Sequence, residues 1–166
     1  GYMKTKGELF EWCNTVEKHL FTSLVPSVGL IYEVKLKRKG ESDSPNTLHF
    51  LGIPDPLVAN MWNKSYEWQV SYGSWTLSKR NNGTLYYIAG DDFDSPYSDW
   101  IKLTVWRYGT KIHLWVNGIY LGGFTETSFT YGYMGIGMME QDADVSPLLV
   151  DSAKVWYSPT PPYPLY

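Results

Sequence analysis

The sequence predicts an all-β protein whose antiparallel strands form a sandwich or a barrel. Along most of the chain, apolar and polar residues alternate with period two, which is typical of strands that bury one face. Turn-forming residues recur about every 8–12 residues. Aromatic residues, which favour strands, make up 17% of the 166 residues. No convincing helical pattern separates these segments, so we expect an antiparallel rather than a parallel sheet.

The N-terminal segment fits two kinds of element. Its apolar residues at positions 9, 12, 13, 16 and 20 would form one stripe of a helix. Because every later segment alternates as a strand does, we expect strands near residues 8–14 and 19–24. A short helix is the alternative.

Five further strands are predicted before residue 90. They span residues 29–39, 47–53, 66–72, 75–79 and 84–89. The last two are joined by Asn81-Asn82-Gly83, a strong hairpin signal because Asn and Gly accept a positive φ. In the 66–72 strand we expect the aromatic-rich face to point into the core, since the other face carries Glu67, Gln69 and Ser71.

The stretch from residue 99 to residue 124 predicts three consecutive strands joined by tight turns. A two-residue loop at Gly109-Thr110 would pair Tyr108 with Lys111, and a second turn follows at Asn117-Gly118. This pairing places Trp106 opposite His113 and Thr104 opposite Trp115. The inward face is apolar throughout: Ile101, Leu103, Val105, Ile112, Leu114 and Val116. Two last strands, near 133–139 and 148–157, complete the predicted sheets.

The composition excludes several classes of function. A net charge of −3 argues against nucleic acid as a partner, because binding phosphates requires a basic patch. No apolar run approaches 18 residues, so we expect no membrane insertion. Cys13 is the single cysteine, which rules out an internal disulfide but does not fix the compartment.

The C-terminal segment has a different composition from the rest of the chain. Residues 1–158 are expected to form one domain, and residues 159–166 a Pro-rich tail or the start of a linker. This division suggests a domain of a longer, modular protein that contains other domains.

Four segments resemble the concanavalin A-like lectin/glucanase superfamily in their order and spacing of apolar, aromatic and Asn-Gly positions. They are residues 100–105, 111–118, 133–137 and 150–156. The resemblance covers about the C-terminal two-thirds of the chain and implies a jelly-roll sandwich of two curved antiparallel sheets. Members of the superfamily include lectins, carbohydrate-binding modules, laminin-G-like adhesion domains and glycan-cleaving enzymes, so fold alone does not fix function.

The outward face of the 101–116 hairpin is the leading candidate site. It carries two tryptophans where a solvated sheet would carry Thr, Lys or Glu. Indole rings can stack on the C–H face of a sugar while neighbouring side chains bind its hydroxyl groups. The predicted carbohydrate-binding residues are Trp106, Trp115, His113, Asn117, Tyr108 and Lys102. The alternative is that another segment covers the rings as a small second core.

Two further aromatic residues and one group of acids are weaker candidates. Trp62 and Trp75 lie at expected strand ends or loops, where binding sites often occur. A structural calcium ion, which the resemblance also suggests, would bind carboxylates of the acidic loops. The candidate ligands are Asp91, Asp92, Asp94 and Asp151. Solvated loop acids are the alternative interpretation.

Catalytic motifs are weak. Glu140-Gln141-Asp142-Ala143-Asp144 resembles the acidic motif of family-16 glucanases, but its last glutamate is missing. We therefore expect a non-catalytic, lectin-like domain of an extracellular or cell-surface protein that binds a polysaccharide or glycan. A structural or adhesion domain that contacts protein is the alternative, and a glycan-cleaving enzyme is the third.

Overall fold

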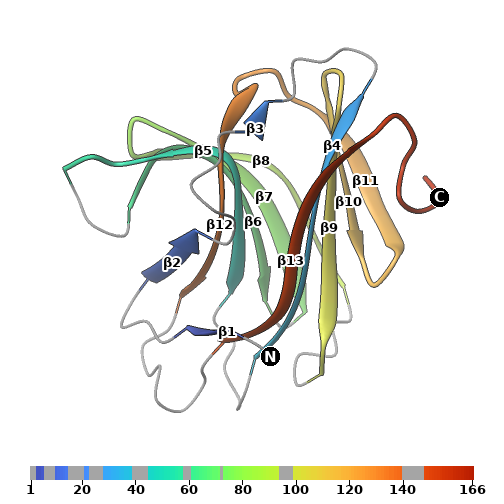
Figure 1. The fold of residues 1–166 in the computed structure, drawn as a ribbon, viewed down its shortest axis with the longest axis horizontal. Coiled ribbons are helices and arrows are strands. Elements are labelled where there is room, and N and C mark those ends of the chain that lie inside the picture. Colours follow the sequence, from blue (N-terminus) through green and yellow to red (C-terminus); the bar gives the residue numbers. More distant parts are fainter. Residues whose placement is uncertain are drawn as a thin grey trace.

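The computed structural model is an all-β sandwich, as the sequence predicts (Figure 1). It describes residues 3–5, 10–14, 21–22, 28–38, 45–57, 61–71, 73–93, 99–139 and 148–166. Within these ranges all regular elements are strands, and residues 10–14 and 21–22 are strands, as expected. The rest of the two expected N-terminal strands lies outside the described residues.

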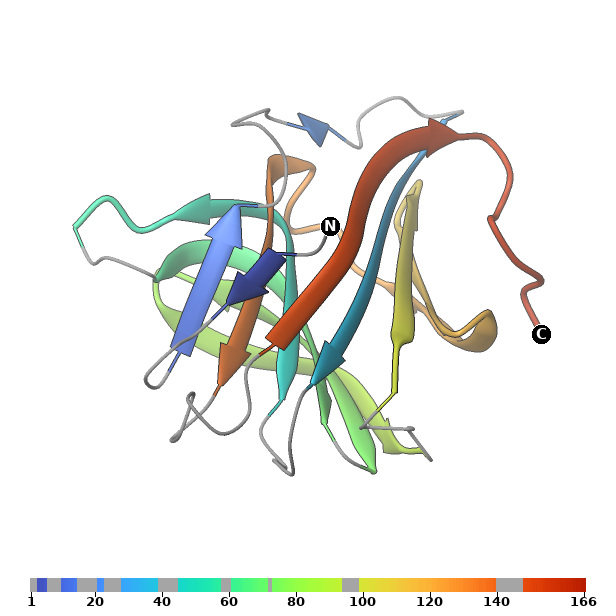
Figure 2. The ribbon, with the colours of Figure 1, turned by 60° about the horizontal axis from the view of Figure 1, so that its bottom comes forward.

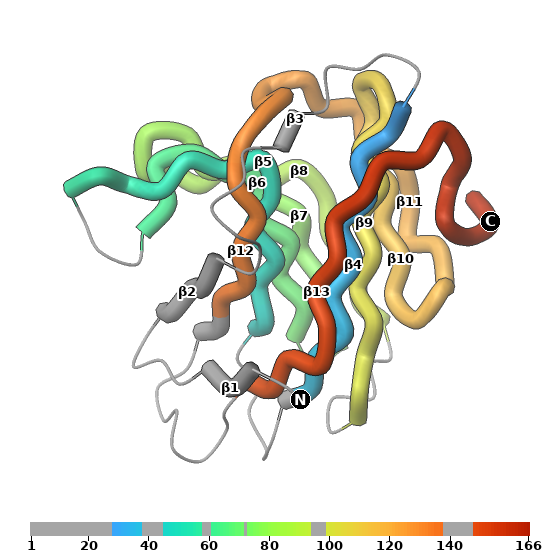
Figure 3. Tube along the Cα trace, in the orientation of Figure 1, coloured from blue at the N-terminus to red at the C-terminus, as the bar shows by residue number. Residues whose placement is uncertain are grey.

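The first sheet contains six strands, all antiparallel where they pair. Its order is β1 (Met3–Thr5), β13 (Leu148–Ser158), β4 (Gly29–Arg38), β9 (Ile101–Tyr108), β10 (Lys111–Val116) and β11 (Ile119–Thr125). In Figure 3, β13 and β4 run side by side over their whole length. The last strand of the chain therefore lies inside the sheet and not at its edge.

The second sheet contains seven strands. Its order is β2 (Phe10–Asn14), β12 (Tyr131–Met139), β5 (Asn46–Pro54), β6 (Trp62–Ser71), β7 (Ser74–Asn81) and β8 (Thr84–Asp92), and β3 (Phe21–Thr22) also pairs with β12. Figure 1 shows this sheet facing the first, as in a jelly-roll sandwich.

The inward faces of the two sheets form the main core. The predicted inward residues of the hairpin are all 3% exposed or less, as are Tyr66, Trp68 and Val70 on β6. Tyr72, the fourth member of that predicted face, lies outside the described residues. Arg107 continues the inward alternation of β9, and its guanidinium lies 5.8 Å from the Tyr66 ring. Burial lowers the pKa of Arg107.

Candidate functional site

The hairpin of β9 and β10 forms in the predicted register. Tyr108 pairs with Lys111, Trp106 with His113 and Thr104 with Trp115. The next turn has positive φ angles of 51° at Asn117 and 80° at Gly118. These angles are those of a two-residue hairpin turn whose twist matches that of the strands, so the Asn-Gly signal is confirmed.

The two tryptophans of this hairpin do not face solvent. Trp106 is 4% exposed and Trp115 is 0% exposed. With Ile31 they form a second core on the outer side of the first sheet, against which Tyr120 and Tyr163 pack. The prediction of an exposed tryptophan pair is therefore wrong, because another segment covers both rings.

That segment is the end of β13 together with the C-terminal tail that follows it, and the tail lies on the outer side of β9–β11 (Figure 2). The Trp106 indole N–H donates to the carbonyl oxygen of Ser158 at 3.3 Å, and that of Trp115 to Pro164 at 2.8 Å. The Tyr163 hydroxyl donates to Glu33 Oε2 at 2.8 Å, an oxygen that also accepts the Thr104 hydroxyl at 3.0 Å. A buried indole N–H needs an acceptor. The last residue of β13 provides one for Trp106, and the tail provides one for Trp115. Residues 159–164 thus pack against the first sheet.

The remaining predicted residues of this face are also held by internal contacts. His113 Nδ1 lies 2.8 Å from the Tyr120 hydroxyl, and burial, followed by the charge of Lys111, lowers the pKa of His113. Asn117 Oδ1 accepts the backbone N–H of Lys102 at 2.8 Å. The Lys102 ammonium lies 4.8 Å from the centre of the Tyr163 ring.

Tyr108 stacks on Trp106 with ring centres 4.7 Å apart and is 36% exposed. The structure therefore brings all six predicted residues onto one face. Their contacts make that face a closed cluster and not an open site.

The two secondary tryptophans are buried as well. Trp62 is 1% exposed and Trp75 is 5% exposed. Trp62 is the first residue of β6 and stacks on His49, with ring centres 4.9 Å apart and an interplanar angle of 19°. Trp75 contacts Phe124 at 5.7 Å. Both residues lie at strand ends, as expected, but the expectation that their rings are accessible is wrong. Trp62 belongs to β6, which begins before the position that the alternation indicated, and Trp75 points into the main core.

The proposed calcium ligands are only partly within the described residues. Asp91 and Asp92 end β8 in the second sheet, whereas Asp151 lies in the first sheet and forms a 3.3 Å ion pair with Lys35. Asp94 and the acidic run from Glu140 to Asp144 lie outside the described residues. In the part of the chain that is described, no three His, Cys, Asp or Glu side chains are grouped as metal ligands. Calcium binding stays a prediction.

A different polar surface lies on the outer side of the second sheet, over β6, β7 and β8. Cross-strand pairing puts Glu67 next to Ser78, Gln69 next to Thr76 and Ser65 next to Arg80. On β8, Tyr87 pairs with Ser78 and Gly90 with Thr76. Paired residues point to the same side of a sheet, and Tyr66, Trp68 and Val70 occupy the core side of β6. We call the residues Glu67, Gln69, Thr76, Ser78, Arg80 and Tyr87 the β6–β8 face.

A charged pair organises this face. Arg80 donates from Nε to Glu67 Oε1 at 2.6 Å and from Nη2 to Glu67 Oε2 at 3.2 Å, while its Nη1 donates to the carbonyl oxygen of Gly83 at 2.8 Å. Ser65 also donates to Glu67 Oε1 at 3.3 Å and lies 3.4 Å from His49 Nδ1. Glu67 is 0% exposed, so its carboxylate depends on these donors for stabilisation.

The accessible part of the face lies beside this pair. Tyr87 is 69% exposed, and Gln69 and Thr76 are half-buried. Within the described structure, neither the Gln69 amide nor the Thr76 hydroxyl has a hydrogen-bond partner. Gly90 adds no side chain next to Thr76; a Cβ there would lie 2.7 Å from the Trp75 carbonyl oxygen. The result is a partly accessible area with free amide and hydroxyl groups, beside an exposed phenol ring and Arg80.

In the sequence, the polar side of the 66–72 strand indicated nothing more than an outward face. A signal for the charged pair was nevertheless present. A tight turn around Gly73, which has a φ of 82°, pairs Ser71 with Ser74 and therefore Ser65 with Arg80. The same register argument that paired Trp106 with His113 would have placed Arg80 diagonally across from Glu67.

Comparison with known proteins identifies the fold. No protein-family model matches the chain, and no curated protein sequence matches it. Solved structures do match. The carbohydrate-binding module CBM66 from Bacillus subtilis has a TM-score of 0.62 at 14% identity, with 95% of each chain covered. Sheep galectin-11 has a TM-score of 0.58 at 10% identity, covering 85% of this chain and 98% of that chain.

This chain has a concanavalin A-like, galectin-like jelly-roll fold. A Bacillus licheniformis β-glucanase also matches, with a TM-score of 0.54 at 13% identity, covering 77% of this chain and 65% of that chain. The solved proteins with a similar fold thus include a carbohydrate-binding module, a galectin and a β-glucanase. In the described part of the chain, no helix has the length and apolar character needed to cross a bilayer.

Proposed function

We propose that this domain is a non-catalytic, lectin-like module that binds a carbohydrate on the β6–β8 face. The observation that carries the proposal is the exposed Tyr87 ring, in register with Ser78 and beside the Glu67–Arg80 pair. A pyranose can place its C–H face on such a ring while its hydroxyls bind the Gln69 amide, the Thr76 hydroxyl and the remaining Arg80 N–H groups. The sugar-binding names among the structural neighbours support this class of ligand.

The proposal includes an extracellular or cell-surface location and a modular parent protein. A polysaccharide would be accessible to the domain in that location. Tethering to other modules would raise the effective concentration of the domain at its ligand, so that weak binding by one domain is sufficient.

The binding experiment uses a glycan array together with pull-down on insoluble polysaccharides. We expect the wild type to bind at least one glycan, and Tyr87→Ala to weaken that binding roughly tenfold or more, on the order of one lost aromatic contact. Tyr86→Ala is the matched control. Tyr86 is the preceding residue on β8 and is 49% exposed, but it pairs with Lys79 and points to the other side of the sheet.

The outcomes separate the alternatives. If the wild type binds no glycan in either assay, the lectin proposal fails and a protein-contacting domain becomes the better hypothesis. If both tyrosine variants bind as the wild type does, the sugar lies elsewhere on the domain. Release of new reducing ends by the wild type would instead make the domain a glycan-cleaving enzyme.

A further inference from the structure

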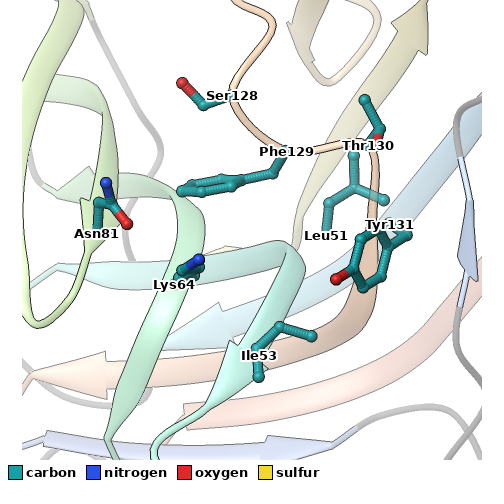
Figure 4. Close-up of a pocket in the computed structure, with 8 residues that line it drawn as sticks. All are labelled: Leu51, Ile53, Lys64, Asn81, Ser128, Phe129, Thr130 and Tyr131. Carbon is teal, nitrogen blue, oxygen red and sulfur yellow. The ribbon is translucent and has the colours of Figure 1, made fainter.

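A pocket of about 340 Å³ opens at one end of the sandwich (Figure 4). It lies between the ends of β5–β7 on one side and, on the other, the segment 126–130 that joins β11 to β12 and the first residue of β12. Lys64 pairs with both Ile53 and Asn81, and all three line the pocket. Because they alternate with Ser65 and Arg80, they are on the core side of the sheet. The pocket is therefore on the opposite side of the sheet from the β6–β8 face.

The pocket depends on an unusual backbone arrangement. Leu51, which lines it, has a φ of 51° in an irregular part of β5, a conformation that is uncommon for a large residue. Gly132 packs directly on the peptide between Leu51 and Gly52, and a Cβ on Gly132 would lie 2.2 Å from the Leu51 carbonyl carbon. Because Gly132 is held against this peptide, the preceding residue, Tyr131, is held beside Leu51 in the lining of the pocket. Strained backbone held by close packing is a feature of ligand sites.

The aromatic lining is fixed at a second point. Phe129 packs on Tyr66 with ring centres 5.0 Å apart, and its backbone N–H donates to the Tyr66 hydroxyl at 2.9 Å. Tyr131 is 53% exposed and provides a second ring and a hydroxyl group. Figure 4 shows Asn81, Lys64 and Tyr131 around one opening, with the Phe129 ring beside them.

The charge of the pocket is positive. Lys64 is half-buried, and within the described part of the chain its ammonium has neither an ion pair nor a hydrogen bond; the same holds for the Asn81 amide. The nearby Lys79 differs, because it is paired with Glu126 Oε2 at 3.1 Å and donates to the Ser128 hydroxyl at 2.8 Å. One cation in the pocket is thus left for a ligand.

We propose that this pocket is a second binding site, specific for one carboxylated sugar unit such as a uronic acid. The carboxylate binds Lys64, the ring packs against Phe129 and Tyr131, and Asn81 binds a hydroxyl group. The volume lies near the lower end of the range for ligand pockets, about 300–1,000 Å³, which suits a single sugar ring. This site is independent of the β6–β8 face.

The test is a titration of ¹⁵N-labelled protein with sodium D-galacturonate and, separately, with D-galactose, followed by NMR. We expect galacturonate to shift the backbone amide signals of Lys64, Asn81, Phe129 and Tyr131, and galactose at the same concentration to leave them in place. Signals of Ser78 and Tyr87 should not move with galacturonate, which separates this site from the β6–β8 face. A response to galactose as strong as that to galacturonate, or no response to either sugar, would overturn the proposal.

Variants and a third probe make the test specific. Lys64→Met, which keeps an unbranched side chain of similar length but removes the charge, should weaken galacturonate binding roughly tenfold or more, the usual effect of losing a charge-assisted hydrogen bond. Lys111→Met removes an exposed lysine from β10 and should bind as the wild type does. If sodium sulfate binds as tightly as galacturonate, the pocket is a general anion site and the assignment to a sugar is wrong.

Discussion

The indole N–H of Trp115 donates a hydrogen bond to the carbonyl oxygen of Pro164, 2.8 Å away and 49 residues later in the chain. Trp115 is 0% exposed. Leaving a buried donor of this kind without an acceptor costs about 1–3 kcal/mol. The tail is therefore needed to complete the packing of Trp115 on the outer side of the first sheet.

Tyr163→Ala should destabilise the domain by about 1–3 kcal/mol, because it removes a ring from the Trp115 cluster and the bond to Glu33. Tyr163→Phe loses only the hydroxyl group and should cost about 1 kcal/mol. Urea unfolding gives both values, and tryptophan emission should shift to longer wavelength only in the Ala variant. Tyr166→Ala, at a residue 96% exposed, is the control. Wild-type stability and emission in Tyr163→Ala would show that the tail does not cover the rings.

Arg80→Met should cost about 3–5 kcal/mol, since it leaves the fully buried Glu67 carboxylate without its main partner. The Glu67→Met/Arg80→Met double variant should regain part of this loss, because no unpaired charge remains. A double-mutant cycle measured by urea unfolding determines the coupling between the two residues. Strictly additive losses would mean that the ion pair contributes no stability of its own.

Acid should destabilise the domain through His49. Burial, and then the charge of Arg80, lowers the pKa of His49 from 6.5 to about 3. Its 3.8 Å contact with Glu67 is therefore not an ion pair at neutral pH. Between these two pH values the unfolded chain binds more protons than the folded domain. Stability then falls as the pH falls, by up to about 1.4 kcal/mol per pH unit.

The measurement is the free energy of unfolding between pH 7.5 and pH 4 for the wild type and for His49→Gln. The variant should show a shallower slope. His113 also has a lowered pKa and adds to the wild-type slope in the same direction, so His113→Gln is the second variant to compare. Equal slopes in the wild type and His49→Gln would show that His49 is protonated normally in the folded domain.

Gly132→Ala should cost about 3 kcal/mol or more, because the new Cβ would overlap the backbone of Leu51 and Gly52. Gly109→Ala is the matched control. Gly109 has a positive φ of 57°, but no atom lies within 4 Å of the position that a Cβ would take, so its cost should be about 1–2 kcal/mol. Thermal unfolding compares the two. A Gly132→Ala loss no larger than the control would mean that the β5–β12 contact is loose.

The parts of the fold that the sequence predicts are those set by local chemistry. Alternation and the turn at Gly109-Thr110 are sufficient to derive the β9–β10 register, because a tight turn constrains the residues on both sides of it. The Asn117-Gly118 turn does the same for the residues where β10 meets β11. Trp62 illustrates the limit. The irregular part of β5 near Leu51 changes the pairing of β6, so the alternation does not show that β6 begins at Trp62.

The candidate site was harder to predict because its surroundings come from distant parts of the chain. A Pro-rich segment is typical of a spacer. Nothing in residues 159–166 themselves indicates that the indole of Trp115, 49 residues earlier, donates to Pro164, or that the indole of Trp106 donates to Ser158 just before the tail. The Glu67–Arg80 pair also links residues 13 apart, but across one hairpin, and was therefore within reach of a register argument.

The position of the last strands has a consequence for the order of folding. β1 pairs with β13, while β2 and β3 pair with β12, so each of these N-terminal strands pairs with one of the last two strands. During synthesis β1, β2 and β3 therefore cannot form these pairs until the chain beyond residue 130 has been made. Hairpins such as β9–β10 can form early and locally, whereas closure of both sheets joins the two ends of the chain in a late, non-local step.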